Sequence, residues 1–390
     1  MENDRVKILL LANHASCVYN LQLDLIRELL QIGYEVIISC LYESCIEELK
    51  SLGCSYIEAN FNNRGTSVRS DLKLINHYRR ILQEINPQVV LTYRIKPTIY
   101  GGIATNKENV PFVANITGLG SGVENKGLLQ IITVSLYHIA FKKVSCVFFQ
   151  NKENLEFFKK KKIKLRHTKL LPGSGVNLDK YNLLPYLDSK QISFILIARI
   201  MKEKGIDQYL DAASYIKDKY PNTSFHVCGF SEGDYKLKLE IYEQQGIITY
   251  HGRVDDIREI LKDVHCTIHP SYNEGLSNAL LESAAAGRVL IASNIHGCKE
   301  TIDEGKNGYT FEVKNTLDLI DKIELFLSLP FEKKREMGMH SREKIEKEFD
   351  RKIVVQAYMK VIDDIVGAQN LETNLNIKEG RNELIRPSHQ

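Results

Sequence analysis

Two glutamates in the stretch SYNEGLSNALLESAAAG, residues 271–287, stand where they could bind a ligand rich in hydroxyl groups. Glu274 follows an apolar run that predicts a strand, and Glu282 falls in the first turns of the helix that follows. Ser277 or Asn278 can cap that helix. Because carboxylates accept hydrogen bonds from hydroxyl groups, the two side chains suit two hydroxyl-bearing groups of one ligand.

The backbone between these glutamates predicts an anion site. The peptide N–H groups of Gly275, Leu276 and Ser277 would point, together with the helix dipole, toward one spot. Gly275 has no side chain to hold a ligand away, and Gly287 can end the helix. A diphosphate flanked by two groups that carry hydroxyls fits such a site.

A pair of cations in ARIMKEKG, residues 198–205, complements that site. Arg199 stands at the end of the predicted strand Ile192–Ile197, and Lys204 follows five residues later. Two cations at the carboxyl end of a strand can neutralise the charge that develops on a departing diphosphate. Either pair alone would more often be a solvated helix surface. Their occurrence after strands of the same βαβ region favours the functional interpretation.

These residues depend on a framework of short apolar runs that alternate with longer amphipathic stretches, a pattern typical of parallel sheets covered by helices. The predicted strands of the first half are Val6–Ala12, Val36–Ser39, Tyr56–Ala59, Val89–Thr92, Phe112–Ile116 and Cys146–Phe149. Those of the second half are Ile192–Ile197, Phe225–Cys228, Ile248–His251, Cys266–His269 and Val289–Ala292. The predicted helices include Leu21–Gln31, Leu72–Ile85, Leu128–Phe141, Asp207–Lys219, Tyr235–Gln245, Ile257–Lys262, Ala279–Ala286 and Ile353–Val366.

The alternation restarts near residue 192, so we predict two α/β domains in series. The predicted parts are an N-terminal domain over 1–173, a linker over 174–190, a C-terminal domain over 191–350, a helix over 351–367 that crosses back to the first domain, and a flexible tail over 368–390. Ligands of open α/β sheets bind at the carboxyl ends of the strands. We therefore expect a deep cleft between the two domains.

Length and composition agree with a soluble two-domain enzyme. The 390 residues exceed one ordinary core, and 43% hydrophobic with 26% charged residues is usual for globular proteins. A net charge of +3 does not call for a polyanionic partner. The eight cysteines form no CxxC pair, no run is long enough to span a bilayer, and no signal peptide is recognisable. These features predict a reducing, cytoplasmic compartment.

Four motifs of the second half carry a resemblance to a known family. They are ARIMKEKG (198–205), HGRVDDIREIL (251–261), HPSYNEGLSNALLESAAAGRVLIAS (269–293) and HGCKETIDEGKNGY (296–309). With these motifs the chain resembles the retaining GT-B glycosyltransferases of family 4. HASCVYNLQLDLIREL (14–29) and NITGLGSG (115–122) resemble bacterial N-acetylgalactosaminyltransferases that act on undecaprenyl-diphosphate-linked sugars.

The resemblance implies a GT-B fold, in which two Rossmann-like domains face each other across a cleft, and a hexosyltransferase activity. Arg199 and Lys204 would bind the donor diphosphate, Glu282 the ribose and Glu274 the hexose hydroxyls. The amides of Gly275–Ser277 would contact phosphate and sugar. By family habit the donor is a UDP-sugar.

The resemblance also places Arg253 and Val254 near the base, but it leaves the acceptor side open. Many family members carry a histidine after the fourth or fifth strand of the N-terminal domain. Here that region reads ITGLGSG, with Gly118 and Gly120 in place of a histidine. His14, after the first strand, is the nearest substitute. A role of His14 near the acceptor and a purely structural role are equally consistent with the sequence.

The implied mechanism is a front-face transfer that retains the anomeric configuration, with Glu274, Arg199 and Lys204 as the catalytic residues. No D-x-D occurs in the sequence, so we expect neither a dedicated metal site nor a cofactor. Two alternatives stay open: a GT-B nucleotide-sugar epimerase and a catalytically idle nucleotide-sugar-binding subunit. A dehydrogenase is disfavoured because the turn after the first strand, ANHASCVY, is no G-x-G-x-x-G.

A basic strip over residues 142–169 holds ten Lys or Arg residues and two acids, and it follows the apolar stretch 127–143. A buried helix with a solvated basic loop would explain both features. The functional interpretation is a peripheral platform on the anionic inner face of the cytoplasmic membrane, next to a polyprenyl-diphosphate-linked saccharide as acceptor. Nucleic acid is not expected, because no aromatic residues are interleaved for base stacking.

Overall fold

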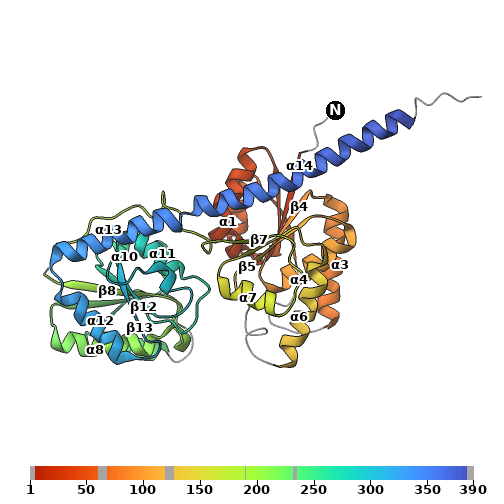
Figure 1. Ribbon diagram of the computed structural model, residues 1–390. Coiled ribbons are helices and arrows are strands. Elements are labelled where there is room, and N and C mark those ends of the chain that lie inside the picture. Colours follow the sequence, from red (N-terminus) through yellow and green to blue (C-terminus); the bar gives the residue numbers. More distant parts are fainter. Residues whose placement is uncertain (1–4, 60–67, 119–126, 189, 232–234, 384–390) are drawn as a thin grey trace, which may run out of the picture. The chain divides into compact units, whose positions relative to one another are not determined.

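The computed structural model describes residues 5–59, 68–118, 127–188, 190–231 and 235–383. It divides into two compact units, Met1–Leu171 with Val354–Gln390, and Pro172–Ile353. Each unit is a parallel sheet covered by helices on both faces (Figure 1), which confirms the predicted fold class.

The first unit contains a seven-stranded sheet in the order β3-β2-β1-β4-β5-β6-β7, with neighbouring strands parallel. Its strands are β1 (Lys7–His14), β2 (Glu35–Leu41), β3 (Ser55–Glu58), β4 (Val89–Tyr93), β5 (Phe112–Ile116), β6 (Cys146–Phe149) and β7 (Thr168–Leu170). Its helices before the crossover are α1 (Ala15–Gln31), α2 (Cys45–Ser51), α3 (Val68–Ile85), α4 (Ile95–Glu108), α6 (Leu128–Ala140), η1 (Phe141–Lys143) and α7 (Lys152–Lys160).

The central strands of this sheet are apolar along their whole length because both faces are covered. β4, β5 and β6 are buried at every position. Helices α1, α2 and α14 (Arg351–Glu383) pack on one face, and α3, α4, α6 and α7 pack on the other.

The second unit contains a six-stranded parallel sheet in the order β10-β9-β8-β11-β12-β13. Its strands are β8 (Ile192–Ile197), β9 (Thr223–Cys228), β10 (Thr249–Tyr250), β11 (Cys266–His269), β12 (Val289–Ser293) and β13 (Gly308–Phe311). Its helices are η2 (Lys202–Lys204), α8 (Ile206–Lys219), α9 (Tyr235–Gln244), α10 (Arg258–Leu261), α11 (Asn278–Ala285), η3 (Lys299–Thr301), α12 (Thr316–Ser328) and α13 (Phe331–Glu348). Helices α8, α9 and α12 pack on one face, and α10, α11 and α13 contribute to the core on the other.

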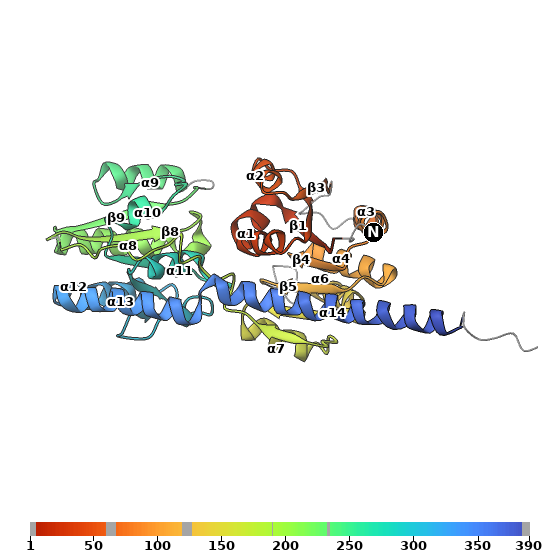
Figure 2. The ribbon, with the colours of Figure 1, turned by 90° about the horizontal axis from the view of Figure 1, so that it is seen from above.

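The long helix α14 begins in the second unit and continues along the first (Figure 2). Val354, Tyr358 and Ile362 on its apolar side are buried in the core of the first unit. The Tyr358 ring lies 4.4 Å from the Phe148 ring, centroid to centroid. The predicted crossing of this helix back to the first domain is therefore confirmed.

Two segments differ from the description that the sequence suggested. Residues 174–190 were expected to be a linker, yet Val176 and Tyr181 are buried in the core of the second unit. The chain from Ala368 was expected to be a flexible tail, yet α14 continues to Glu383. No proline occurs in residues 351–386, so nothing in this stretch of the sequence removes a helical hydrogen bond.

Candidate functional site

The predicted donor residues follow the two central strands of the second sheet. Later strands run outward from β8 on one side and from β11 on the other, so the strand order reverses between these two. Open α/β sheets bind ligands at this reversal, beyond the carboxyl ends of the strands. Lys204 is the last residue of η2, in the segment that follows β8. Glu274 lies in the loop that follows β11.

Lys204 and Glu274 form an ion pair at this edge of the sheet. The Lys204 Nζ lies 2.5 Å from the Glu274 Oε1, and both side chains are mostly buried. The His269 Nε2 lies 2.9 Å from the same carboxylate oxygen. Burial alone would raise the pKa of Glu274, but the interactions with His269 and Lys204 outweigh it and lower this pKa to about 2. The carboxylate is therefore ionised at neutral pH.

The two loops that carry this pair are fixed against each other by backbone contacts. The amide of Tyr272 donates to the carbonyl of Glu203 over 2.8 Å. Gly205 adopts φ +71°, and a Cβ at this position would overlap the carbonyl of Pro270. Glycine is required at this position for both reasons, so the cation and the carboxylate are held together by the fold.

A third loop, which follows β12, supports the glutamate loop from the other side. The amide of Ser277 donates to the carbonyl of Gly297 over 2.8 Å. A Cβ on Gly297, where φ is +82°, would lie 2.8 Å from the carbonyl oxygen of Glu274. This arrangement differs from the prediction that the Ser277 amide meets a phosphate, because that donor is already engaged. Gly275 and Leu276 remain the predicted phosphate contacts.

Ser277 has a second part in the site as the N-cap of α11. Its Oγ accepts the amide of Leu280 at 3.4 Å and lies 3.1 Å from the His269 Nε2. The hydroxyl thereby satisfies one of the first amides of the helix. His269 was not among the predicted site residues. Its sequence signal was the position at the end of a buried strand, in HPSYNEG.

The second predicted carboxylate, Glu282, lies on α11 in different surroundings. The hydroxyl of Tyr181 donates to it, and Lys180 and Arg351 supply nearby positive charge. Burial is the largest influence and raises the pKa of Glu282 despite these groups. Neither Tyr181 nor Arg351 was predicted as a site residue, because Tyr181 falls in the expected linker and Arg351 begins the crossover helix.

The remaining donor candidates lie at the same edge of the sheet and are more exposed. Arg199 follows β8 and Arg253 follows β10, and both side chains are exposed. Val254 is half-buried against the core beside α10 and α11. The amide of Gly229 donates to the carbonyl of Gly252 over 2.8 Å, which joins the ends of β9 and β10. Exposed cations and a half-buried apolar side chain thus follow strands at the same edge of the sheet as the Lys204–Glu274 pair.

The acceptor-side candidates belong to the first unit. His14 ends β1, where the Nδ1 lies 3.4 Å from the Oε1 of Glu43, and the Oε2 of Glu43 accepts the amide of Ser16 at 2.6 Å. Gly118 follows β5, and a Cβ at this position would meet no atom of the described residues within 4 Å. Gly120 lies outside the described residues. The strand order of this sheet reverses between β1 and β4, so His14 stands at the reversal.

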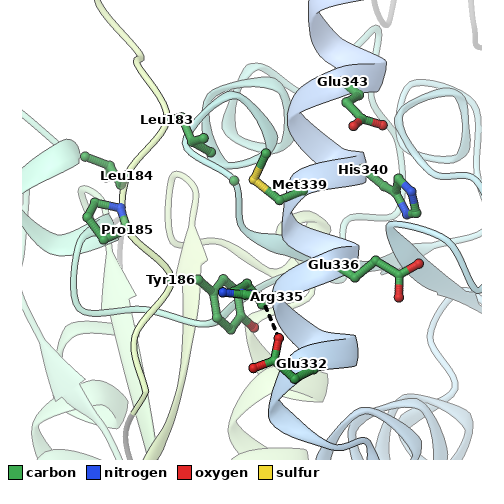
Figure 3. Close-up of a pocket in the computed structure, with 11 residues that line it drawn as sticks. Leu183, Leu184, Pro185, Tyr186, Glu332, Arg335, Glu336, Met339, His340 and Glu343 are labelled. Carbon is green, nitrogen blue, oxygen red and sulfur yellow. Dashed lines mark ion pairs between the residues drawn. The ribbon is translucent and has the colours of Figure 1, made fainter.

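A separate groove of the second unit lies between residues 183–186 and α13 (Figure 3). Its cavity volume is about 760 Å³. One of its carboxylates, Glu332, is paired with Arg335 over 2.6 Å. Gly287, which also lines it, precedes β12, whereas the donor residues follow the strands. The groove therefore lies apart from the candidate site, and none of the predicted residues lines it.

The grouping of metal-binding side chains and the character of the helices bear on cofactors and membranes. Among the described residues, no three His, Cys, Asp or Glu side chains are grouped so that they could hold a metal ion. Within the same residues, no helix combines the length and the apolar character that crossing a bilayer requires.

Comparison with known families places two domains on this chain. Residues 7–151 match the family described as glycosyl transferase 4-like, and residues 186–344 match the glycosyl transferases group 1. The second match covers Lys204, His269, Glu274 and Glu282. Both descriptions name glycosyltransferases and give no support to the epimerase alternative.

Two curated relatives are similar over most of their length. The chain is 25% identical to the N,N'-diacetylbacillosaminyl-diphospho-undecaprenol alpha-1,3-N-acetylgalactosaminyltransferase of Campylobacter jejuni, over 93% of this chain and 99% of the relative. It is 23% identical to the UDP-Gal:alpha-D-GlcNAc-diphosphoundecaprenol alpha-1,3-galactosyltransferase of Escherichia coli, over 67% of this chain and 71% of the relative.

Solved structures agree on the fold. A glycosyltransferase from Rickettsia africae superposes with a TM-score of 0.78 at 20% identity, over 93% of this chain and 99% of its own. HepE from Anabaena, in complex with UDP and glucose, superposes with a TM-score of 0.75 at 16% identity, over 92% and 100%. The chain therefore joins a glycosyl transferase 4-like domain to a group 1 glycosyl transferase domain, and it is a glycosyltransferase of the GT-B fold.

Proposed function

We propose that this glycosyltransferase moves a hexose or N-acetylhexosamine from a UDP-sugar to a saccharide carried on a polyprenyl diphosphate. The observation that carries the donor half is the buried Lys204–Glu274 pair, with His269, at the strand reversal of the second sheet. The acceptor half is supported by the two relatives whose names specify undecaprenyl-diphosphate-linked sugars.

In this proposal the second unit binds the charged diphosphate and the sugar hydroxyl groups of the donor. Arg199 and Lys204 bind the diphosphate, and the amides of Gly275 and Leu276 add donors from the backbone. Glu274 accepts hydroxyl hydrogens of the hexose, and Glu282 accepts those of the ribose.

The base completes the donor contacts, next to Arg253 and Val254. An apolar side chain beside an exposed guanidinium suits a flat, polar ring. The choice of UDP is supported by the E. coli relative, whose name specifies a UDP-sugar.

The proposed reaction is a front-face transfer with retained anomeric configuration. The bond between the anomeric carbon and the diphosphate breaks, the acceptor hydroxyl oxygen bonds to the same face, and its proton leaves with the diphosphate. Arg199 and Lys204 stabilise the charge that grows on the leaving diphosphate, while Glu274 favours the positive charge at the anomeric centre. Chelation should leave turnover unchanged if these side chains supply the needed charge.

The acceptor is assigned to the first unit, near the ends of β1 and β5. His14 and Gly118 are the candidates that the structure describes, and Gly120 is a candidate from the sequence alone. The contact between the His14 Nδ1 and Glu43 orients the imidazole, which is useful for a group that is to contact an acceptor hydroxyl.

A contact with the cytoplasmic face of a membrane forms the last part of the proposal, and α6 supports it. Five large apolar side chains of this helix are exposed, namely Leu128, Leu129, Ile131, Ile132 and Ile139. The Lys161 Nζ at the end of α7 lies 3.3 Å from the Gln130 Oε1. The start of the basic segment 159–169 therefore borders an apolar helix surface, the combination that anionic bilayers bind.

The test is turnover with a panel of UDP-sugars and a synthetic polyprenyl-diphosphate-linked saccharide. One donor should raise the melting temperature more than the others, and the same donor should be used for transfer. NMR of the product should show the donor's anomeric configuration. An inverted product would refute the front-face mechanism, and conversion of the donor without an acceptor would refute transfer as the activity.

A further inference from the structure

His269 is the last residue of β11 and is buried, with a side chain 3% exposed. Its Nε2 makes two contacts, at 2.9 Å to the Glu274 Oε1 and at 3.1 Å to the Ser277 Oγ. Because carboxylates only accept hydrogen bonds when ionised, the hydrogen of this contact belongs to the Nε2. One ring nitrogen thus links the glutamate loop to the start of α11.

The other ring nitrogen of His269 is not used. Its Nδ1 is buried and makes no hydrogen bond to any described residue. A buried polar atom without a partner destabilises a fold, so such an atom needs a structural explanation. An apolar side chain of similar size would avoid this penalty between β11 and α11. Packing alone does not explain a histidine here, whereas the Nε2 contacts do.

The arrangement of the contacts around Glu274 explains what this link could do. Both Lys204 and His269 contact the same oxygen, Oε1. A carboxylate that is anchored through one oxygen has a fixed plane, and its second oxygen keeps a fixed direction. Such an arrangement presents one acceptor to a ligand at a defined angle, as a preorganised site requires.

We propose that His269 is a positioning residue, which anchors the Oε1 of Glu274 so that the Oε2 accepts a hydroxyl hydrogen of the donor hexose. This inference rests on the proposed function, in which Glu274 contacts that hexose. His269 does not touch the donor itself and acts through Glu274. It also couples the carboxylate to Ser277, the N-cap of α11, which directly follows the amides of Gly275 and Leu276 that are proposed to bind phosphate.

Lys204 also contacts Glu274, and its second role in the proposed function distinguishes it from His269. Lys204 is shared, because in the proposed function its ammonium also binds the donor diphosphate. When part of the hydrogen-bonding capacity of Lys204 is used by phosphate, the imidazole, which does not bind the diphosphate, still anchors Glu274. The lowered pKa of Glu274 agrees with two donors at one buried oxygen.

The experiment compares two substitutions of His269 that differ only in the donor group. His269→Gln places an amide N–H near the position of the Nε2, whereas His269→Leu keeps the bulk and removes the donor. We expect the leucine variant to lose about 10-fold to 100-fold in kcat/KM for the UDP-sugar, and the glutamine variant to stay within about fivefold of the wild type. Thr267→Val, on the same buried strand, is the matched control and should be unchanged.

A pH profile separates positioning from a structural effect. Without His269 the buried carboxylate loses a donor, so its pKa rises and it protonates at a higher pH. The ratio of kcat/KM between the leucine variant and the wild type should therefore fall further from pH 8 to pH 5. Affinity for UDP, which has no hexose, should remain within about twofold. His269→Met supplies a second apolar variant if the leucine protein does not fold.

Two results would overturn the inference. One is equal loss in the glutamine and leucine variants with a pH-independent ratio. The other is a leucine variant with wild-type kcat/KM. Glu274→Gln distinguishes this failure from failure of the proposed function. If Glu274→Gln retains full turnover, the donor site is wrong, and if it loses turnover while His269→Leu does not, only the positioning inference falls.

Discussion

The two sheets share a topology but treat charge differently at the strand reversal. In the second unit, the side chains of Lys204, Glu274 and His269 are 20%, 14% and 3% exposed. In the first unit, those of His14 and Glu43 are 46% and 35% exposed. One sheet carries a buried charged cluster at this edge, and the other carries a more exposed contact between a histidine and a glutamate.

This difference indicates how each unit can recognise a ligand. Charges interact more strongly where water is excluded, so the buried cluster is suited to grip a diphosphate and a hexose. An exposed pair is screened and contributes little. We infer that the first unit gains acceptor affinity over a wider surface, which includes the apolar side chains of α6.

The largest expected effect compares one alanine substitution in each unit. Glu274→Ala should lower kcat by about 10³-fold, because it removes a buried, preorganised carboxylate. His14→Ala should lower it by about tenfold or less, since its partner and surroundings are solvated. Turnover measured with saturating donor and acceptor checks both.

Circular dichroism and thermal melting should show that both variants remain folded. The comparison between the two units would be broken by similar losses in both variants. A near-normal Glu274→Ala enzyme would remove the donor assignment altogether.

The second prediction concerns stability in acid, to which a buried histidine of the second unit, His265, contributes. His265 is 1% exposed, and its Nε2 lies 3.2 Å from the carbonyl of Leu187, while its Nδ1 accepts the amide of Ser193. Burial lowers the pKa of His265 to about 4, whereas an unfolded histidine titrates near 6.5. The folded state therefore favours the neutral ring.

The sign follows from proton binding. Between pH 6.5 and pH 4 the unfolded state binds more protons, so stability that is fully present above pH 6.5 is lost as the pH falls toward 4. The loss from His265 should reach about 3 kcal/mol in the free energy of unfolding. Urea unfolding at pH 7.5, 6, 5 and 4 checks the total, and hydrogen exchange should show the second unit opening first. Uniform loss of protection in both units would contradict the comparison.

The framework of both units was largely predictable, because buried parallel strands are continuous apolar runs. β5, β6, β8 and β11 begin and end at the residues that the sequence predicted. β7 and β13 were missed. β7 is an edge strand with exposed residues at both ends and no apolar run, and β13, although mostly buried, has the mixed sequence GYTF. Fold class depends on the central strands, so these omissions did not affect it.

The site was predictable only in part, because proximity across the sequence leaves no local signal. Glu274 and Lys204 were named from the types of residue that follow strands. Their ion pair depends on β8 and β11 being neighbours in the sheet. His269 and Tyr181 were not named, since a histidine ending a strand and a tyrosine in a polar stretch have common structural explanations. Only the fold shows that each meets a predicted carboxylate.

The third prediction sharpens the assignment within the donor loop. Lys204→Met should lower kcat/KM by about 10²-fold, because it removes a cation from both Glu274 and the leaving diphosphate. Lys202→Met, in the same short helix η2 but with an exposed side chain, is the matched control and should stay within about twofold. Steady-state kinetics with the preferred UDP-sugar checks this pair. Equal losses would show that only the overall charge of the loop matters.

The smallest expected effect tests the wider surface of the first unit. Leu128 and Ile131 on α6 are 73% and 63% exposed, and Leu317 on α12 of the second unit is 74% exposed. Replacing both α6 residues by asparagine should weaken binding to phosphatidylglycerol vesicles by about tenfold, since each would lose part of about 1.5–3 kcal/mol of apolar burial. Leu317→Asn is the control and should not change sedimentation with vesicles.

Activity on a short, water-soluble acceptor should be the same in all three proteins, because the vesicle surface is absent from that assay. A wild-type protein that ignores anionic vesicles at low salt would remove the membrane contact from the proposed function. If the α6 variant and the Leu317→Asn control sediment alike, the contact would have to be sought elsewhere on the protein. Loss of vesicle binding in the α6 variant alone would instead show that the first unit binds through exposed apolar area, in contrast to the buried charges of the second unit.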